Sequence, residues 1–189
     1  MFRDRSSRFL AFGFPVETIA EINDIVSVIR KKYHDARHHC YAYRLGHRKE
    51  LFRVNDDGEP SGTAGKPIYG QMLSYDLTNT LVIVVRYFGG TLLGTSGLIN
   101  AYRSATIDML SKATFVTRFI EDHFRLSFPY EKLNTVMKVL KEENLLPLQP
   151  VFDAQCTMII TIRRSLSDSL SGRLSGISGL VTESLQMSD

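Results

Sequence analysis

The chain has 189 residues, of which 23 are Lys or Arg, 20 are Asp or Glu, and 43% are hydrophobic. Such a length predicts one or two domains, and the composition excludes a disordered chain, a collagen-like repeat and a disulfide-stapled miniprotein. The longest aliphatic run, Leu81–Val85, is much shorter than the roughly 18 apolar residues of a membrane helix. The start, Met1–Arg5, is too charged for a signal peptide. We therefore expect a cytoplasmic protein with no membrane partner.

The chain begins with a predicted strand and helix. A strand is expected over 8–14, ended by Pro15, and Thr18 then caps a helix. Apolar residues recur there at steps of three and four, which predicts that one helix face points to a core. These residues are Ile19, Ile22, Val26 and Ile29.

Short strands alternate with loops and helices up to residue 120. Strands are expected over 40–45 and 50–54, joined by a hairpin loop, and a short helix over 67–73. The stretch 80–88 is almost wholly apolar, which is typical of a strand buried on both faces. A glycine-rich turn and a helix follow it.

We place a domain boundary near residue 120. The sequence pattern after it predicts the order β-α-β-β-α-β. The expected elements are strand 123–128, helix 130–143, two strands between 146 and 163, helix 165–175 and strand 179–186. This order indicates a ferredoxin-like domain. The helix 165–175 is Ser-rich, but Leu166, Leu170, Leu174 and Ile177 recur at helical steps, which favours an amphipathic helix over disorder. We predict an α+β protein with domains 1–120 and 121–189.

The boundary separates charges of opposite sign. Residues 1–120 hold 16 basic and 11 acidic side chains, a net charge of +5, whereas residues 121–189 hold 7 and 9, a net charge of −2. An asymmetry of this kind points to an anionic partner for the first domain.

The glycine-rich turn Gly89–Gly97 has two interpretations. Converging backbone N–H groups before a helix can cradle a phosphate, with Arg86 and Arg103 adding charge. Alternatively, the glycines serve only a tight, closely packed turn. The segment matches neither the Walker A motif nor Gly-x-Gly-x-x-Gly.

The loop 55–65 also has two interpretations. Asp56, Asp57 and Glu59 could bind a divalent cation or act in acid–base chemistry, or they could cap neighbouring N–H groups of a rigid loop, which we favour. Ser61 and Thr63 lack the sequence context of a nucleophile.

Histidine and cysteine residues gather in a third candidate region. His34, His38, His39, Cys40 and His47 fall within 14 positions, but no His-Glu-x-x-His motif is present. We expect no bound metal or cofactor, and a histidine that contacts phosphate or lines a cleft is the simpler role. Cys40 and Cys156 form no CxxC pair and are expected as reduced thiols.

Four segments together resemble the IMPACT/YigZ family. They are Ser7–Ala11, His38–Tyr43, Asp56–Ile68 and Arg86–Gly94. The chain differs from the usual family pattern at His39, Ser96 and Asn100, where Asn, Gly and a basic residue are common.

The resemblance implies a fold and a cellular context. The first domain would have the fold of ribonuclease PH and of the second domain of a small-subunit ribosomal protein. The second domain would resemble a C-terminal domain of elongation factor G. Eukaryotic relatives regulate translation by competing for the activator of a translation-initiation kinase.

The leading hypothesis is a regulator or binding protein that contacts RNA or the translation machinery through an anion-binding cleft in the first domain. The alternative is an enzyme that acts on a small phosphorylated substrate, with a metal held by Asp56–Glu59; the sequence favours a role without catalysis. A third hypothesis is an adaptor whose second domain docks a protein partner. The residues expected at the cleft are His38, Arg44, Asp57, Gly58, Glu59, Ser61, Gly62, Thr63, Gly65, Lys66, Arg86, Tyr87, Gly89, Gly90, Gly94, Gly97 and Arg103.

Overall fold

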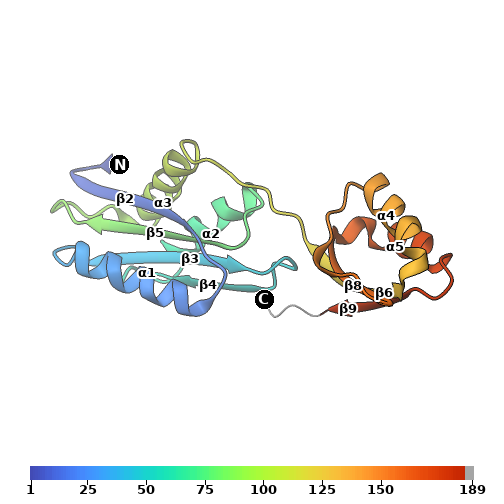
Figure 1. Cartoon of the computed structure of the whole chain (residues 1–189). Helices are drawn as coiled ribbons and strands as arrows, with labels where there is room; N and C mark the ends of the chain where they lie inside the picture. The colour runs from blue at the N-terminus through green and yellow to red at the C-terminus, as the bar shows by residue number, and fades with distance from the viewer. Residues whose placement is uncertain (186–189) are drawn as a thin grey trace. The chain divides into compact units, whose positions relative to one another are not determined.

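The structure, a computed structural model, describes residues 1–185 and contains two compact units. The first spans Met1–Phe115 and the second Val116–Asp189. Each has its own antiparallel sheet and helices, so the α+β class is confirmed (Figure 1). The chain passes between the units slightly before the boundary predicted at residue 120.

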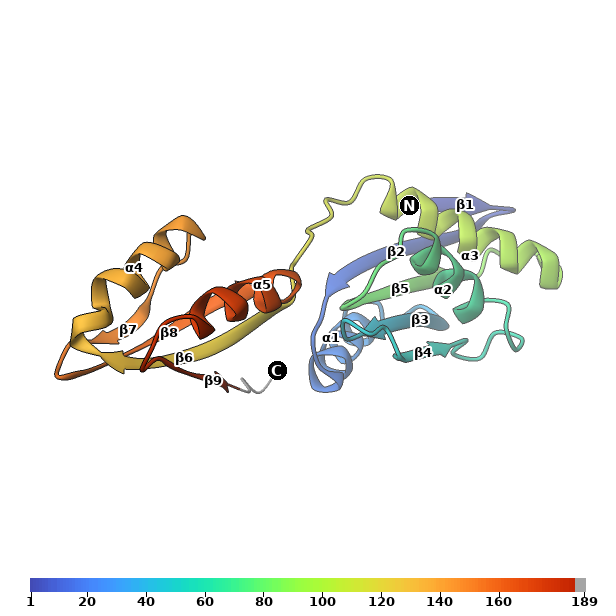
Figure 2. The same ribbon diagram turned by 90° about the vertical axis from the view of Figure 1, so that its right-hand side faces the viewer.

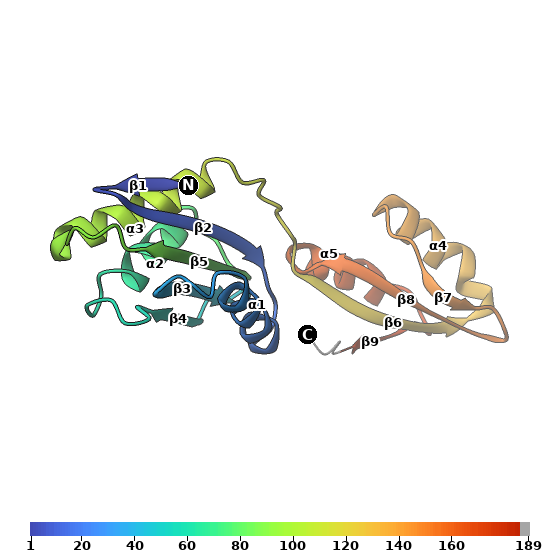
Figure 3. The ribbon, with the colours of Figure 1, turned by 90° about the vertical axis from the view of Figure 1, so that its left-hand side faces the viewer.

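The first unit is a five-stranded sheet with helices on both faces. Its strand order is β1-β2-β5-β3-β4, and every neighbouring pair is antiparallel. Helix α1 covers one face, and α2 and α3 cover the other (Figures 2 and 3). The strands are β1 Phe2–Asp4, β2 Ser7–Pro15, β3 His38–Leu45, β4 Leu51–Asn55 and β5 Thr80–Tyr87, and the helices are α1 Ile19–Lys32, α2 Gly65–Ser74 and α3 Gly94–Leu110.

The central strand β5 is buried on both faces, as its apolar sequence predicts. Because side chains alternate along a strand, Val82 and Val84 pack with α2 and α3, whereas Ile83 and Val85 pack with α1. All of 81–86 is buried. The sheet thus separates two cores that share this strand.

Helix α1 begins at the residue that the sequence predicts. The Thr18 hydroxyl accepts from the Glu21 N–H at 3.2 Å, and the Glu21 carboxylate accepts from the Thr18 N–H, which completes a capping box. Ile22 and Ile29 are buried, but Ile19 in the first turn is 40% exposed, which corrects the expected core face.

The strand β1 was not predicted. It has only three residues, two of them charged, so it carries no readable alternation. It pairs with β2 across a turn in which Arg5 and Ser6 both have positive φ. The turn brings Arg5 beside the start of β2.

The second unit has the predicted order of elements. Its sheet order is β7-β8-β6-β9, and helices α4 and α5 pack on one face (Figure 2). The bounds are β6 Glu121–Pro129, the 3-10 turn η1 Tyr130–Lys132, α4 Leu133–Glu142, β7 Leu148–Val151, β8 Gln155–Arg163, α5 Arg164–Ser175 and β9 Val181–Leu185. In α5, Leu170 and Leu174 are buried, which confirms the amphipathic helix, although Leu166 is 47% exposed. Residue 186, the expected end of the last strand, lies outside the described residues.

Candidate functional site

The two glycine-rich segments lie at one end of the first sheet, which we call the turn end. Here β1 turns into β2, β3 begins at His38, and β4 and β5 end at Asn55 and Tyr87. The loop 55–65 and the segment 88–93 follow these last two strands, and both views show them at the same end (Figures 2 and 3). His38 pairs directly with Arg86 across the sheet. The structure therefore brings together most of the predicted site residues.

Asp56 holds the loop 55–65 in shape. One carboxylate oxygen accepts from the Ala64 and Gly65 N–H groups at 3.0 and 2.8 Å, and the other accepts from the Gly62 N–H at 2.8 Å. Ala64 and Gly65 begin α2, so the carboxylate also caps that helix. This agrees with the interpretation that we favoured for the loop.

Asp57 ties the same loop to β3. Its carboxylate accepts from the His39 N–H at 2.6 Å and pairs with Arg30. Its carbonyl oxygen lies 2.9 Å from Nδ1 of His38, and because a carbonyl only accepts, Nδ1 carries the proton. Gly58 follows with a φ of +85°, a conformation that glycine adopts without strain.

Glu59 is the centre of a buried polar cluster. Its Oε1 accepts from the Arg86 guanidinium at 2.7 Å and from the Tyr102 hydroxyl at 2.8 Å. The side chains of Arg86 and Glu59 are only 5% and 3% exposed. Burial raises the pKa of the Tyr102 hydroxyl and of the Cys40 thiol, which lies 3.3 Å from it. The cluster locks the loop 55–65 to β5 and α3.

The segment after β5 has open space around two of its glycines, unlike the loop 55–65, which internal hydrogen bonds hold in shape. Gly90 and Gly94 have φ values of +87° and +70°, and a Cβ on either would meet nothing within 4 Å. Gly89, in contrast, packs against the Ser6 backbone, where a Cβ would lie 2.2 Å from a carbonyl carbon. Helix α3 begins at Gly94 with no side-chain cap, and residues 94–96 of its first turn are exposed.

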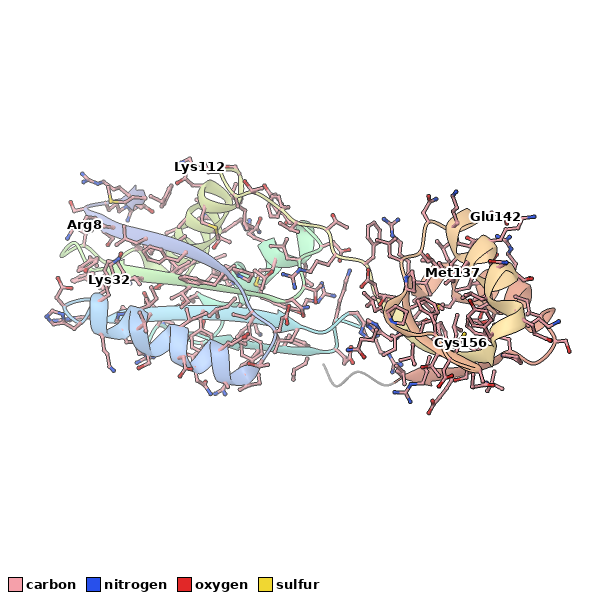
Figure 4. The ribbon with its side chains drawn as sticks, viewed as in Figure 1. Arg8, Lys32, Lys112, Met137, Glu142 and Cys156 are labelled. Atoms are coloured by element: carbon pink, nitrogen blue, oxygen red, sulfur yellow. The ribbon has the colours of Figure 1, made fainter. Side chains whose placement is uncertain are left out.

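Basic residues outnumber acidic ones at the turn end. It carries nine basic and five acidic side chains, a net charge of +4, with Arg8 and Lys32 labelled in Figure 4. The opposite end, where β2 and α3 finish and α1 starts, carries four basic and five acidic side chains, which are Arg44, Arg48, Lys49 and Lys112, with Glu17, Glu21, Glu50, Asp76 and Asp108. The turn-end charges are Arg3, Arg5, Arg8, Arg30, Lys31, Lys32, Arg37, Lys66 and Arg86, with Asp4, Asp35, Asp56, Asp57 and Glu59.

Three predicted phosphate contacts need correction. Arg44 lies at the opposite end of β3, where its guanidinium is 3.7 Å from Asp76, because it stands six positions after His38 along the strand. Arg86 is buried against Glu59 and does not line an open cleft. Tyr87 belongs to the α1 face of the sheet, where its hydroxyl donates to Asp35 at 2.8 Å.

The remaining predicted residues divide by exposure. Ser61, Lys66, Gly90, Gly94 and Arg103 are exposed. Thr63 and Gly65 are buried and Gly62 donates to Asp56, so these three support the loop and do not face a ligand. Gly94 and Gly97 lie in the first turn of α3, not in the preceding loop as expected.

The structure does not support the alternative in which the segment Asp56–Glu59 holds a metal ion. The three carboxylates of the loop 55–65 are directed at separate internal partners, and within residues 1–185 no group of three His, Cys, Asp or Glu side chains is arranged to hold a metal ion. Two hollows, of about 430 and 680 Å³, lie beside the C-terminal end of α3 and beside α4, away from the predicted site. Cys40 and Cys156 are buried free thiols, as predicted.

Sequence reasoning missed five residues of the turn end. Tyr102 lies in α3, beyond the glycine-rich segment. Its hydrogen-bond partner Glu59 is 43 positions away in the sequence. Arg5, Arg8, Lys32 and Arg37 come from three separate segments. The only available signal was the +5 charge of the first 120 residues, which does not say where the charge gathers.

The comparisons with known proteins decide the family. The family model described as the Impact N-terminal domain matches residues 5–110. The chain belongs to the IMPACT family. "IMPACT family member YvyE" of Bacillus subtilis is 36% identical over 74% of this chain and 64% of its own length. "IMPACT family member YigZ" of Escherichia coli is 33% identical over 72% of this chain and 68% of its own length. The resemblance seen in the sequence is confirmed.

A solved structure extends the similarity of this IMPACT chain to the second unit. The "crystal structure of an hypothetical protein" superposes with a TM-score of 0.68 at 26% identity and covers 99% of this chain and 93% of its own. Within the described residues, no helix is both long and apolar enough to cross a membrane.

Proposed function

We propose that this IMPACT family member is a cytoplasmic binding protein that regulates translation by contacting RNA or the translation machinery through the turn end. The observation that carries this proposal is the gathering of net positive charge at that end. RNA offers a dense row of phosphates, and an excess of Lys and Arg on one surface is the electrostatic footprint of a nucleic-acid-binding protein.

The exposed backbone of the turn end supports the same proposal. Phosphate oxygens accept from backbone N–H groups at helix N-termini, and the first turn of α3 has no side-chain cap to compete. Lys66, at the start of α2, is exposed and forms no ion pair within residues 1–185. It stays a proposed phosphate contact, together with Arg103, which is exposed farther along α3, whereas the buried Arg86 does not.

A salt titration tests the proposal. A fluorescently labelled short RNA is titrated with the full chain at about 50 mM salt and then at rising salt, and the logarithm of affinity should fall linearly with the logarithm of salt concentration. The slope should correspond to several neutralised phosphates. Absence of binding at about 50 mM salt, or an affinity indifferent to salt, contradicts the proposal.

For the second unit we propose a protein partner within the translation machinery. Its helices cover one sheet face, and exposed aliphatic side chains, Leu148, Val151 and Val181, lie on its strands. The test compares co-sedimentation with ribosomes for the full chain and for Val151→Asp. The variant should lose co-sedimentation and keep its affinity for free RNA, and unchanged co-sedimentation contradicts this part.

A further inference from the structure

An aromatic side chain stands exposed at the turn end, beside the buried cluster. Phe88 directly follows β5 and is 40% exposed, in the same turn as Gly89 and Gly90. Leu92, four residues later, is 82% exposed. Phe88 is accessible over part of its surface and lies among basic side chains, which suits a flat apolar ligand that also carries negative charge.

Arg86 contacts the ring of Phe88. The guanidinium carbon lies 5.5 Å from the ring centroid of Phe88 and 5.6 Å from that of Phe9, so the cation contacts both rings. Its Nε has no hydrogen-bond partner, and its Nη1 is held by Glu59. The buried ion pair thereby orients Phe88, because a cation near an aromatic face attracts it. Arg86 and Glu59 act as positioning residues for an exposed ring.

We propose that Phe88 is a stacking platform for an unpaired base, so that the RNA bound at the turn end is single-stranded. This inference rests on the proposed function and names its substrate class. Bases in a duplex are stacked on their neighbours and present no free face to a single ring, whereas an unpaired base stacks readily on an aromatic side chain. The surrounding basic residues then contact the phosphates on either side of that base.

The test uses the full chain with two probes and three variants. The probes are a labelled single-stranded RNA of about ten nucleotides and the duplex of the same sequence. Phe88→Leu keeps an apolar side chain of similar size without a ring, Phe88→Tyr keeps the ring, and Leu92→Ala is the matched control on the same turn. Thermal unfolding of each variant checks that the fold is retained.

We expect Phe88→Leu to bind the single strand about tenfold more weakly, with Phe88→Tyr and Leu92→Ala close to the unchanged protein. The salt slope should be the same for all four proteins, because no charge is removed. Equal affinity for single strand and duplex, or full affinity in Phe88→Leu, overturns the inference and leaves salt-dependent RNA binding standing. If neither probe binds, both the inference and the proposed function fail.

Discussion

The two ends of the first sheet use their charged residues differently. At the turn end the three carboxylates of the loop 55–65 are turned inward, onto backbone N–H groups, Arg86 and Tyr102, while most of the basic residues stay exposed. At the opposite end the charges pair with one another near the surface, as Lys49 does with Asp76, whose side chain is 74% exposed. Because internal partners neutralise the three loop carboxylates, the exposed charge at the turn end is mostly positive. The difference shows how a protein with a small net charge can still present a positively charged surface at one end of a sheet.

The largest expected effect comes from breaking the buried pair at the turn end. Glu59→Gln leaves the Arg86 guanidinium buried without a countercharge, which should lower the free energy of unfolding by about 3–5 kcal/mol. Denaturant unfolding measures this change. The control is Asp76→Asn at the opposite end, which removes an exposed pair and should leave stability almost unchanged. Equal losses in the two variants would show that the ends do not differ as described.

A smaller effect is expected from a methyl group at the close approach behind the glycine-rich turn. In Gly89→Ala the new Cβ would overlap the Ser6 backbone, and the displacement should cost about 1–3 kcal/mol of stability. Gly70→Ala, inside α2 with open space around it, is the matched control and should gain about 0.5–1 kcal/mol. Thermal unfolding compares the two. A stable Gly89→Ala protein would mean that β1 and the turn are not packed together.

The smallest expected effect is a shift in one titration. The Tyr87 hydroxyl donates to Asp35 and holds the pKa of that carboxyl below its usual range. Ionised Asp35 therefore adds stability at neutral pH that is lost as the pH falls through the lowered pKa. Tyr87→Phe should move the pKa of Asp35 upward, as NMR of the carboxyl carbon measures. Asp108, whose pKa is lowered by Lys112 at the opposite end, should not change.

Local patterns in the sequence predict the helices and strands. The placement of the site residues depends on pairings between distant residues, which local patterns do not reveal. The apolar run of β5 and the Thr18 cap depend on neighbouring residues, so they were predicted. The Glu59–Arg86 pair joins residues 27 positions apart, and only the register of β3 against β5 places His38, and not Arg44, beside Arg86. The sequence therefore suggests Arg44 and Arg86 as equivalent phosphate contacts, although one is at the wrong end and the other is buried.

One matched pair of charge reversals tests the account most directly. Arg37 at the turn end and Arg48 at the opposite end are both exposed, and neither forms an ion pair within residues 1–185. Affinity for a short RNA is measured at one low salt concentration for Arg37→Glu and Arg48→Glu. We expect a clear loss of affinity in Arg37→Glu, because one phosphate contact becomes a repulsion, and little change in Arg48→Glu. Equal losses, or a larger loss in Arg48→Glu, would contradict it.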